Sequence, residues 1–466
     1  MPEYLTIADA ALLIAQRKLS PVELVEWHLD RIDRLNPRLA AFILLTRENA
    51  LASARQAEAE IVAGRYRGPL HGIPIAHKDI FCTRGIATTA HSRWLLSHVP
   101  TEDATVVRRL SDAGTVMLGK LATHEFAWGG PSFDLPWPPA RNPWHLDHHT
   151  GGSSSGTGAA VAAGLIMGGT GSDSGGSIRF PAAYCGIAGF KPTYGLCPRT
   201  GVFPLAPSLD HAGPMAWTVE DCAILLQAMA GYDPDDPASV RVQPVDYLRS
   251  LDEPIAGTRI GLVPSFMIPE ADCGDDVLAA LEGAASVFRS AGAKVREITL
   301  PPLVDWTACG MIILTVEAFA IHAHALRTRP ELYGECFRDR ASVGRLIDPG
   351  AYMEAQRLRR ELSGVYCAAL REVDLLLCPI TPAEAPLIAS TTKMGTFERP
   401  SFAMPFNVTG APALGLRAGF ARSGLPIGVQ IAGRPFEDAL VLRAGHQYER
   451  ATGPTQRRPD LAWAVA

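Results

Sequence analysis

Residues 151–192 read GGSSSGTGAAVAAGLIMGGTGSDSGGSIRFPAAYCGIAGFKP, in which two turns rich in Gly and Ser flank a run of small apolar residues. Glycine adopts positive φ angles and has no side chain, so the turns at 151–156 and 168–177 can bring backbone N–H groups close to a ligand. The run at 157–167 contains few helix breakers and predicts a short helix packed closely on a sheet. The pattern indicates a site built from hydroxyls and backbone donors.

Two common ligand-binding motifs are absent from these turns. A phosphate-binding loop places Gly-Lys-Ser/Thr after its glycines, and neither turn contains that lysine. The turns contain no GxGxxG motif for dinucleotides either. Gly152–Gly156 fits the GxSxG pattern with Ser154 as nucleophile, although chance produces this pattern easily in a stretch rich in Ser and Gly. The remaining interpretation is a hydrolase in which a base activates a serine hydroxyl.

A candidate base lies upstream, in Leu70-His-Gly-Ile-Pro-Ile-Ala-His-Lys-Asp79. This apolar run with β-branched residues predicts a buried strand that ends at Lys78. Burial disfavours the charged form of a lysine and lowers its pKa, which makes a neutral amine available as a base. The alternative is a lysine that pairs with Asp79 or extends to the surface.

Together, these motifs resemble the amidase signature family of serine hydrolases. The spacing of Lys78, Ser153 and Ser177 carries the resemblance, within the segments HGIPIAHKD, GGSSSG and GSDSGGSIRFPAAYCGIAGFKPTYG. Nearly the whole chain is covered, because further similar segments are HEFAWGG, RNPW, SLDHAGPMAWTVEDCAILLQAMAGYDPDDPAS, PFNVTGAPA and GLPIGVQIAGRP. The resemblance implies an α/β fold of three layers (α/β/α), in which helices cover a central, mixed and twisted β-sheet.

The resemblance also implies catalytic roles for individual residues. Ser177 is then the nucleophile, Ser153 the bridging hydroxyl and Lys78 the general base. A neutral Lys78 would take a proton from Ser153, which takes one from Ser177 as it attacks the carbonyl carbon. The oxyanion hole would consist of the backbone N–H groups of Ser174, Gly175, Gly176 and Ser177.

Helical and strand patterns alternate along the chain, which agrees with an α/β layered fold. Residues 259–298, for example, predict a strand, a helix and a further strand. We expect a single amidase domain over residues 1–466, with a signature core at about 65–235. A helical region at about 301–366 carries no catalytic motif, and we expect substrate selection there.

Four residues near these motifs are candidates for substrate contact: Trp128, Phe133, Trp137 and Arg179. The three aromatic residues precede or lie in the proline-rich loop at 131–143, where they either line the pocket or only pack the loop. Arg179 is a candidate to hold a substrate carboxylate, although we favour the alternative that it braces the turn through Asp173.

The sequence predicts no cofactor and no metal site. His145, His148 and His149 lie in a loop-like segment, and no HExxH motif accompanies them, so we interpret them as loop histidines rather than metal ligands. The nine cysteines are scattered without a CxxC pair, which is typical of reduced thiols in the cytoplasm. The N-terminus lacks a signal-peptide pattern, and no uninterrupted run of about 18 apolar residues predicts a membrane span.

The charge balance restricts the expected partners. A net charge of −5, from 43 basic and 48 acidic residues, gives no basic stripe for nucleic acid. We therefore expect a small-molecule amide or carbamate substrate and a cytoplasmic location, with neither nucleic acid nor a membrane as partner. A homodimer is one expected assembly.

The expected function is hydrolysis of the C–N bond of a small or medium amide through an acyl-enzyme on Ser177. Such a site also admits aryl esters and carbamates, so a urethanase specialised for carbamates is one alternative. A second alternative is a component of an amidotransferase complex that needs a partner protein. Glutamyl-tRNA amidotransferase A subunits usually have Gln after the GGSIR run, whereas Phe180 stands here, and this difference favours a stand-alone amidase.

Overall fold

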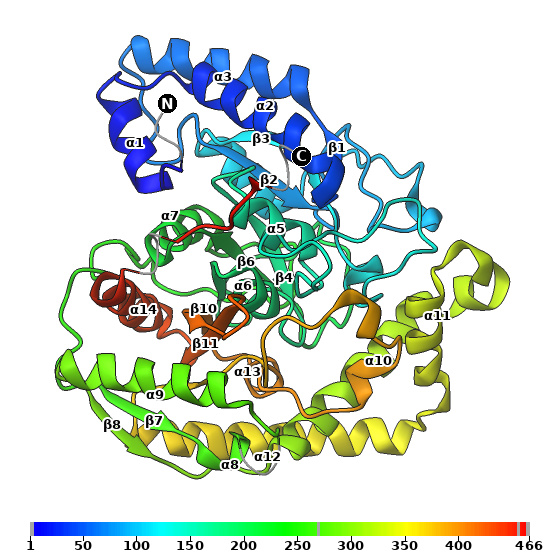
Figure 1. Cartoon of the computed structure of the whole chain (residues 1–466). Helices are drawn as coiled ribbons and strands as arrows, with labels where there is room; N and C mark the ends of the chain where they lie inside the picture. Colours follow the sequence, from blue (N-terminus) through cyan, green and yellow to red (C-terminus); the bar gives the residue numbers. More distant parts are fainter. Residues whose placement is uncertain (1–3, 268–270, 454–456, 463–466) are drawn as a thin grey trace.

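The computed structural model describes residues 4–267, 271–453 and 457–462, and an eleven-stranded β-sheet runs through the middle of the molecule (Figure 1). Three of its inner strands, Pro74–Lys78, Gly168–Asp173 and Pro426–Gly433, are buried along their whole length, as expected for a sheet with both faces covered. The strands are β1 (Phe42–Leu45), β2 (Pro74–Lys78), β3 (Val116–Leu121), β4 (Gly168–Asp173), β5 (Ala188–Lys191), β6 (His211–Ala216), β7 (Arg259–Leu262), β8 (Lys294–Glu297), β9 (Leu375–Pro379), β10 (Ala413–Phe420) and β11 (Pro426–Gly433).

The sheet is mixed, with the strand order β1-β3-β2-β4-β6-β5-β10-β11-β9-β7-β8. β2 pairs in parallel with β3 and β4, whereas β4 pairs with β6 in antiparallel orientation. The pairs β5–β10, β10–β11 and β11–β9 are antiparallel, and β7 pairs in parallel with β9 and β8. The expected α/β fold with a central mixed sheet is confirmed.

Helices cover both faces of this sheet (Figure 1). Leu414 on β10 lies against Gly445 of α14, whereas the next residue, Gly415, lies against Arg179 of α6. Successive strand residues point to opposite faces, so α14 and α6 lie on opposite sides of the sheet. The helices are α1 (Ile7–Ala15), α2 (Pro21–Leu39), α3 (Arg47–Val62), α4 (Thr105–Asp112), α5 (Ser155–Ala162), α6 (Arg179–Cys185), α7 (Val219–Met229), α8 (Pro264–Met267), α9 (Asp275–Ser290), α10 (Leu303–Thr328), α11 (Glu335–Ser342), α12 (Pro349–Glu372), α13 (Met404–Val408) and α14 (Asp438–Thr452).

The second Gly-rich turn begins later than the sequence pattern indicates. Residues 168–173, expected in the turn, form the buried strand β4, and the chain leaves the sheet only after Asp173. Glycine allows this strand to lie close to its neighbour, because a Cβ on Gly169 would be 2.7 Å from the carbonyl oxygen of Ala76 on β2. The helix expected at 157–167 is observed earlier, as α5.

The expected helical region at 301–366 consists of α10, α11 and most of α12. Among the described helices, α10 alone has the length and apolar composition of a membrane span, and half of its most apolar window is buried inside the protein. It packs against α12 and α13. We therefore interpret α10 as a core helix.

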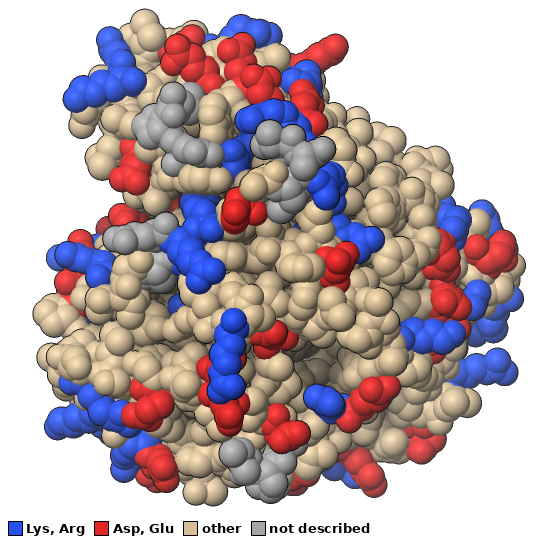
Figure 2. Space-filling model, viewed as in Figure 1, with Lys and Arg blue, Asp and Glu red and all other residues tan. Residues whose placement is uncertain are grey.

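Surface charge and cysteine state also agree with the sequence. Basic and acidic side chains are interspersed on the face shown in Figure 2. All nine cysteines are free thiols, and eight of them are partly or fully buried.

Candidate active site

Lys78 is the last residue of β2, and its side chain is completely buried. Its Nζ atom lies 2.7 Å from Ser153 Oγ, 2.8 Å from Ser172 Oγ and 3.1 Å from Ser154 Oγ. Burial lowers the pKa of Lys78 to about 7, although two nearby aspartates partly oppose this effect. A neutral amine surrounded by hydroxyl groups is therefore available near neutral pH.

Asp79 has a partner other than Lys78. Its carboxylate accepts hydrogen bonds from N and Oγ1 of Thr89, at 2.9 and 2.5 Å, and lies 3.3 Å from Nζ of Lys120. Lys120 also donates to a carbonyl and a hydroxyl in the segment 81–88. Because both charges are fully buried, this ion pair anchors the chain directly after Lys78.

Ser153 follows Gly152 through a cis peptide bond. Its carbonyl oxygen accepts hydrogen bonds from His124 N and Thr123 Oγ1, both at 3.0 Å. The His124 ring lies against Gly152, where an added Cβ would be only 2.0 Å from the ring atom Cε1. These contacts hold Ser153 Oγ beside Lys78 Nζ.

Ser177 lies in the turn between β4 and α6. The carboxylate of Asp173 closes this turn, because it accepts hydrogen bonds from Gly176 N at 2.7 Å and Ile178 N at 3.2 Å. The Gly176 N–H is therefore directed at Asp173, and the expected oxyanion hole loses one of its four donors. Within the described residues, no hydrogen bond occupies the other three backbone N–H groups, those of Ser174, Gly175 and Ser177.

Arg179 is fully buried behind this turn. Its Nε and Nη2 atoms pair with the carboxylate of Asp173 at 3.0 and 2.9 Å, which holds the pKa of Asp173 well below its usual range. The guanidinium also donates to Gln430 Oε1 at 2.8 Å and Asn407 Oδ1 at 2.6 Å. Arg179 is not a substrate contact, because its donors are directed at these buried partners; its position is that of a brace for the turn.

A cavity of about 570 Å³ lies over Ser153 and Ser177. Trp128 lines it, as expected, and so does Phe180. Phe133 is 65% exposed and does not line the cavity, while the Trp137 ring packs on the His91 ring with centroids 5.4 Å apart. The expectation that these two side chains line the pocket is wrong, because both belong to the packing and surface of the loop.

Arg340 on α11 lines the same cavity and is only 7% exposed. Its Nη1 atom donates to the carbonyl of Trp128 at 2.6 Å, and its Nε atom donates to the carbonyl of Lys393. Within the described part of the chain, Arg340 forms no ion pair, and burial lowers its pKa. A buried guanidinium without a carboxylate partner is costly, and an anion bound in the cavity would offset this cost.

Two histidines also line the cavity, His124 and His149. His149, interpreted from the sequence as a loop histidine, accepts a hydrogen bond from Gly151 N at Nδ1, at 2.7 Å. Burial lowers the pKa of His149 to about 4 and that of His124 well below its usual value, so both rings are neutral at pH 7. Among the described residues, no group of three His, Cys, Asp or Glu side chains is placed to hold a metal ion.

Known proteins resemble this chain over almost its whole length. The model of the Amidase family matches residues 23–442. The A subunit of glutamyl-tRNA(Gln) amidotransferase from Hahella chejuensis is 39% identical, with 98% of this chain and 99% of that protein covered. A structure from a vestigial protein complex that reveals the origins of an s-triazine catabolic enzyme is 34% identical, with a TM-score of 0.88 over 96% and 99% of the two chains. Peptide amidase from Stenotrophomonas maltophilia is 32% identical, with a TM-score of 0.85 and 98% of both chains covered.

These relatives correct one expectation from the sequence. Phe180 favours a stand-alone amidase over an amidotransferase component, but curated relatives that are 37–41% identical over nearly the full chain are the A subunits of such amidotransferases. One side chain beside the turn carries less information than a likeness spread over 482 aligned positions, so the distinction drawn from Phe180 is wrong. The family match, the full-length relatives and the shared fold show that the chain belongs to the amidase family.

Proposed function

We propose that this chain cleaves the C–N bond of a small primary amide that carries a carboxylate, and that it acts as one component of an amidotransferase-like complex. Arg340 is the observation that carries the substrate class. The curated relatives, which are components of amidotransferases, support the role in a complex.

The proposed reaction is acyl transfer to Ser177. Neutral Lys78 takes a proton from Ser153 Oγ, which lies 2.7 Å from its Nζ, and Ser153 takes one from Ser177 Oγ as this atom attacks the amide carbon. The C–N bond then breaks, the nitrogen receives the proton through the same relay, and ammonia leaves. Water attacks the acyl-enzyme, releases the carboxylic acid and restores Ser177.

Backbone donors support this step. As the carbonyl carbon becomes tetrahedral, its oxygen gains negative charge, and the available N–H groups of Ser174, Gly175 and Ser177 lie in the turn that presents the nucleophile. One such donor typically contributes roughly 3 kcal/mol to lowering the barrier. Asp173 and Arg179 keep the turn closed, so these donors need no rearrangement during the reaction.

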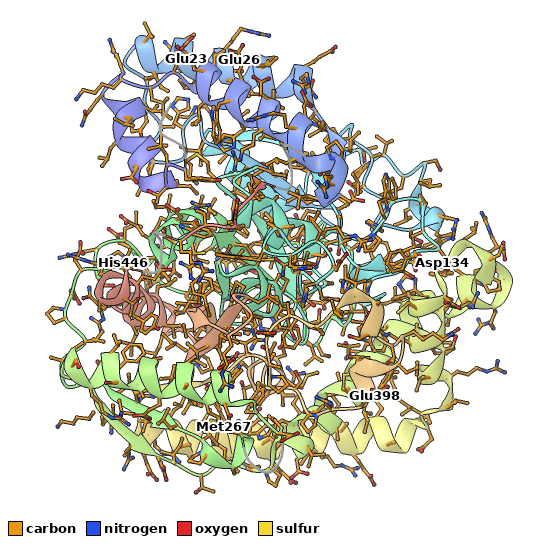
Figure 3. All side chains as sticks on the ribbon, in the orientation of Figure 1. Glu23, Glu26, Asp134, Met267, Glu398 and His446 are labelled. Carbon is orange, nitrogen blue, oxygen red and sulfur yellow. The ribbon has the colours of Figure 1, made fainter. Side chains whose placement is uncertain are left out.

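Arg340 supports a carboxylate on the substrate. A guanidinium has five N–H donors, and the two carbonyls that it contacts leave Nη2 without a described hydrogen-bond partner. A substrate carboxylate would supply the missing negative charge beside this buried guanidinium. Glu384 and Glu398 also line the cavity, and Glu398 lies on the segment between β9 and α13 (Figure 3), so an additional ammonium group on the substrate is compatible with the site.

The test compares succinamate, butyramide and an aryl carbamate as substrates. Succinamate and butyramide share a four-carbon amide, but only succinamate carries a carboxylate. We expect kcat/KM for ammonia release to be at least tenfold higher with succinamate, and Ser177→Ala to abolish it. A preference for butyramide or for the carbamate would overturn the proposed substrate class.

The role in a complex is tested separately. The chain is isolated from its native host under non-denaturing conditions and compared with the chain purified alone. We expect the native form to contain further proteins and to have the higher turnover. The proposed complex is refuted if the native preparation contains no further protein and has the same turnover as the chain purified alone. The proposed chemistry at Ser177 is not affected by that result.

A further inference from the structure

We propose that His149 donates a hydrogen bond from Nε2 to the substrate carboxylate that Arg340 binds, and that this bond helps to set the preference for carboxylate-bearing amides. The inference rests on the proposed function of the same cavity. It assigns a binding role to a residue for which the sequence motifs give none.

The hydrogen bond to Gly151 fixes the tautomer of His149. The backbone N–H of Gly151 is a donor, so the Nδ1 atom that it contacts at 2.7 Å must be unprotonated. A neutral imidazole then carries its proton on Nε2, at the other side of the ring. Within the described residues, no protein group accepts a hydrogen bond from this Nε2 atom, and the residue lines the main cavity.

The backbone of His149 is anchored on both sides. Its N–H donates to the carbonyl of Pro386 at 2.8 Å, and its own carbonyl accepts a hydrogen bond from Asn142 Nδ2 at 2.9 Å. The His124 ring packs against the His149 ring at an interplanar angle of 81°, with centroids 5.6 Å apart. The Nε2 donor is therefore held in one orientation before a substrate arrives, which reduces the entropic cost of binding.

His149 and Arg340 line the same cavity, and Gly130 lines it with them. Gly130 lies against the Arg340 guanidinium, where an added Cβ would be 3.1 Å from Nη2. Gly130 also lines, with His124 and His149, a second void of only about 10 Å³. Such a void holds at most about one water molecule, so a substrate reaches the rings only from the main cavity.

The charge pattern around His149 suits a carboxylate. The positive charge of Arg340 contributes to lowering the pKa of both histidines, after burial, which indicates that its field reaches both rings. Arg340, His124 and Tyr184 are titratable groups that interact with His149, and the ring centroid of Tyr184 lies 6.3 Å from that of His149. One cation beside neutral donors, without a carboxylate among these neighbours, binds a single negative charge better than a neutral group.

Two variants separate the donor from the structural anchor. In His149→Asn the side-chain oxygen takes the place of Nδ1 and keeps an acceptor for Gly151, but the distal donor is lost. In His149→Gln the side-chain amide nitrogen takes the place of Nε2 and keeps the donor, but the acceptor for Gly151 is lost. His145→Asn is the matched control on the same loop, because His145 is exposed and does not line the cavity.

The readout is the ratio of kcat/KM for succinamate to that for butyramide, together with the Kd of succinamate on a Ser177→Ala background by calorimetry. We expect His149→Asn to lower the ratio and weaken binding roughly tenfold or more, which is the size of a hydrogen bond to a charged group. His149→Gln should keep most of the substrate preference and most of the affinity for succinamate, and His145→Asn should match the wild type in both. The opposite order of the two His149 variants, or an unchanged ratio in His149→Asn, would overturn the proposal.

This experiment distinguishes failure of the substrate class from failure of the histidine's role. If the wild type does not prefer succinamate, the proposed substrate class fails. If the wild type prefers succinamate and Arg340→Met abolishes the preference while His149→Asn keeps it, only the role of His149 fails.

Discussion

Replacement of Lys78 by methionine removes the proposed base and also changes how the stability of the protein depends on pH. The lysine is completely buried, and its pKa is lowered from 10.5 to about 7, mainly by burial. Between these two values the unfolded chain binds a proton that the folded protein releases. The free energy of unfolding of the wild type therefore rises with pH in this window and falls as the pH drops from 10.5 towards 7.

The magnitude follows from the shift. One pKa unit corresponds to about 1.4 kcal/mol, so neutral Lys78 costs the folded wild type roughly 4 kcal/mol at pH 7 and less than about 1 kcal/mol at pH 10. Methionine does not titrate. The stability of Lys78→Met relative to the wild type should therefore fall by roughly 3–4 kcal/mol between pH 7 and pH 10.

Urea unfolding of both proteins at several pH values from 7 to 10 measures this difference. The substitution also removes the hydrogen bonds between Lys78 Nζ and the serine hydroxyls, which contributes a constant offset to the stability difference. The change of this difference with pH therefore isolates the titration of Lys78. Lys18→Met is the control, because it also replaces a lysine by methionine, but at an exposed position. A Lys78→Met difference that stays constant within about 1 kcal/mol would show that Lys78 is charged in the folded protein, which would refute its role as a base.

Three further substitutions test separate parts of the site. Arg340→Met should raise the KM for succinamate roughly thirtyfold or more, because the buried substrate carboxylate loses its cationic partner, and steady-state kinetics would contradict the anion position if KM stayed constant. Gly152→Ala places a Cβ 2.0 Å from His124 Cε1. We expect turnover to fall about a hundredfold, while the circular dichroism of the protein stays unchanged. Near-normal turnover would show that the turn can shift freely. Asp79→Asn leaves the charge of Lys120 buried without its partner and should lower the free energy of unfolding in urea by roughly 3–5 kcal/mol. The double variant Asp79→Asn/Lys120→Met should recover much of this loss. Equal stability of the wild type and both variants would refute the ion-pair argument.

The part of the site that lies in local motifs could be predicted from the sequence. Lys78 ends an apolar run, and Ser153 and Ser177 lie in Gly-rich turns, so their residue types and neighbours already restrict what they can do. The structure brings Lys78 Nζ and Ser153 Oγ to 2.7 Å, although 75 positions separate the two residues. Their proximity depends on the parallel pairing of β2 with β4, and the residues of the two motifs do not specify this pairing.

The cavity wall could not be predicted in the same way. Arg340 lies in a helix whose sequence resembles an ordinary charged surface helix, and its significance comes from burial and from the lack of an ion-pair partner among the described residues. His149 stands beside two other loop histidines, and only the hydrogen bond from Gly151 distinguishes it. Phe133 and Trp137 were plausible pocket residues because they are aromatic and near the motifs, but residue type does not fix the direction of a side chain in a proline-rich loop.

The most direct test of the central claim, that Ser177 is the nucleophile, is reaction with a fluorophosphonate followed by peptide mass mapping. This reagent modifies activated serines and does not require the natural substrate. We expect one modification, on Ser177, which is absent in Ser177→Ala and strongly slowed in Lys78→Met. Modification of Ser154 instead of Ser177, or equal labelling of the Ser177→Ala variant, would contradict the account.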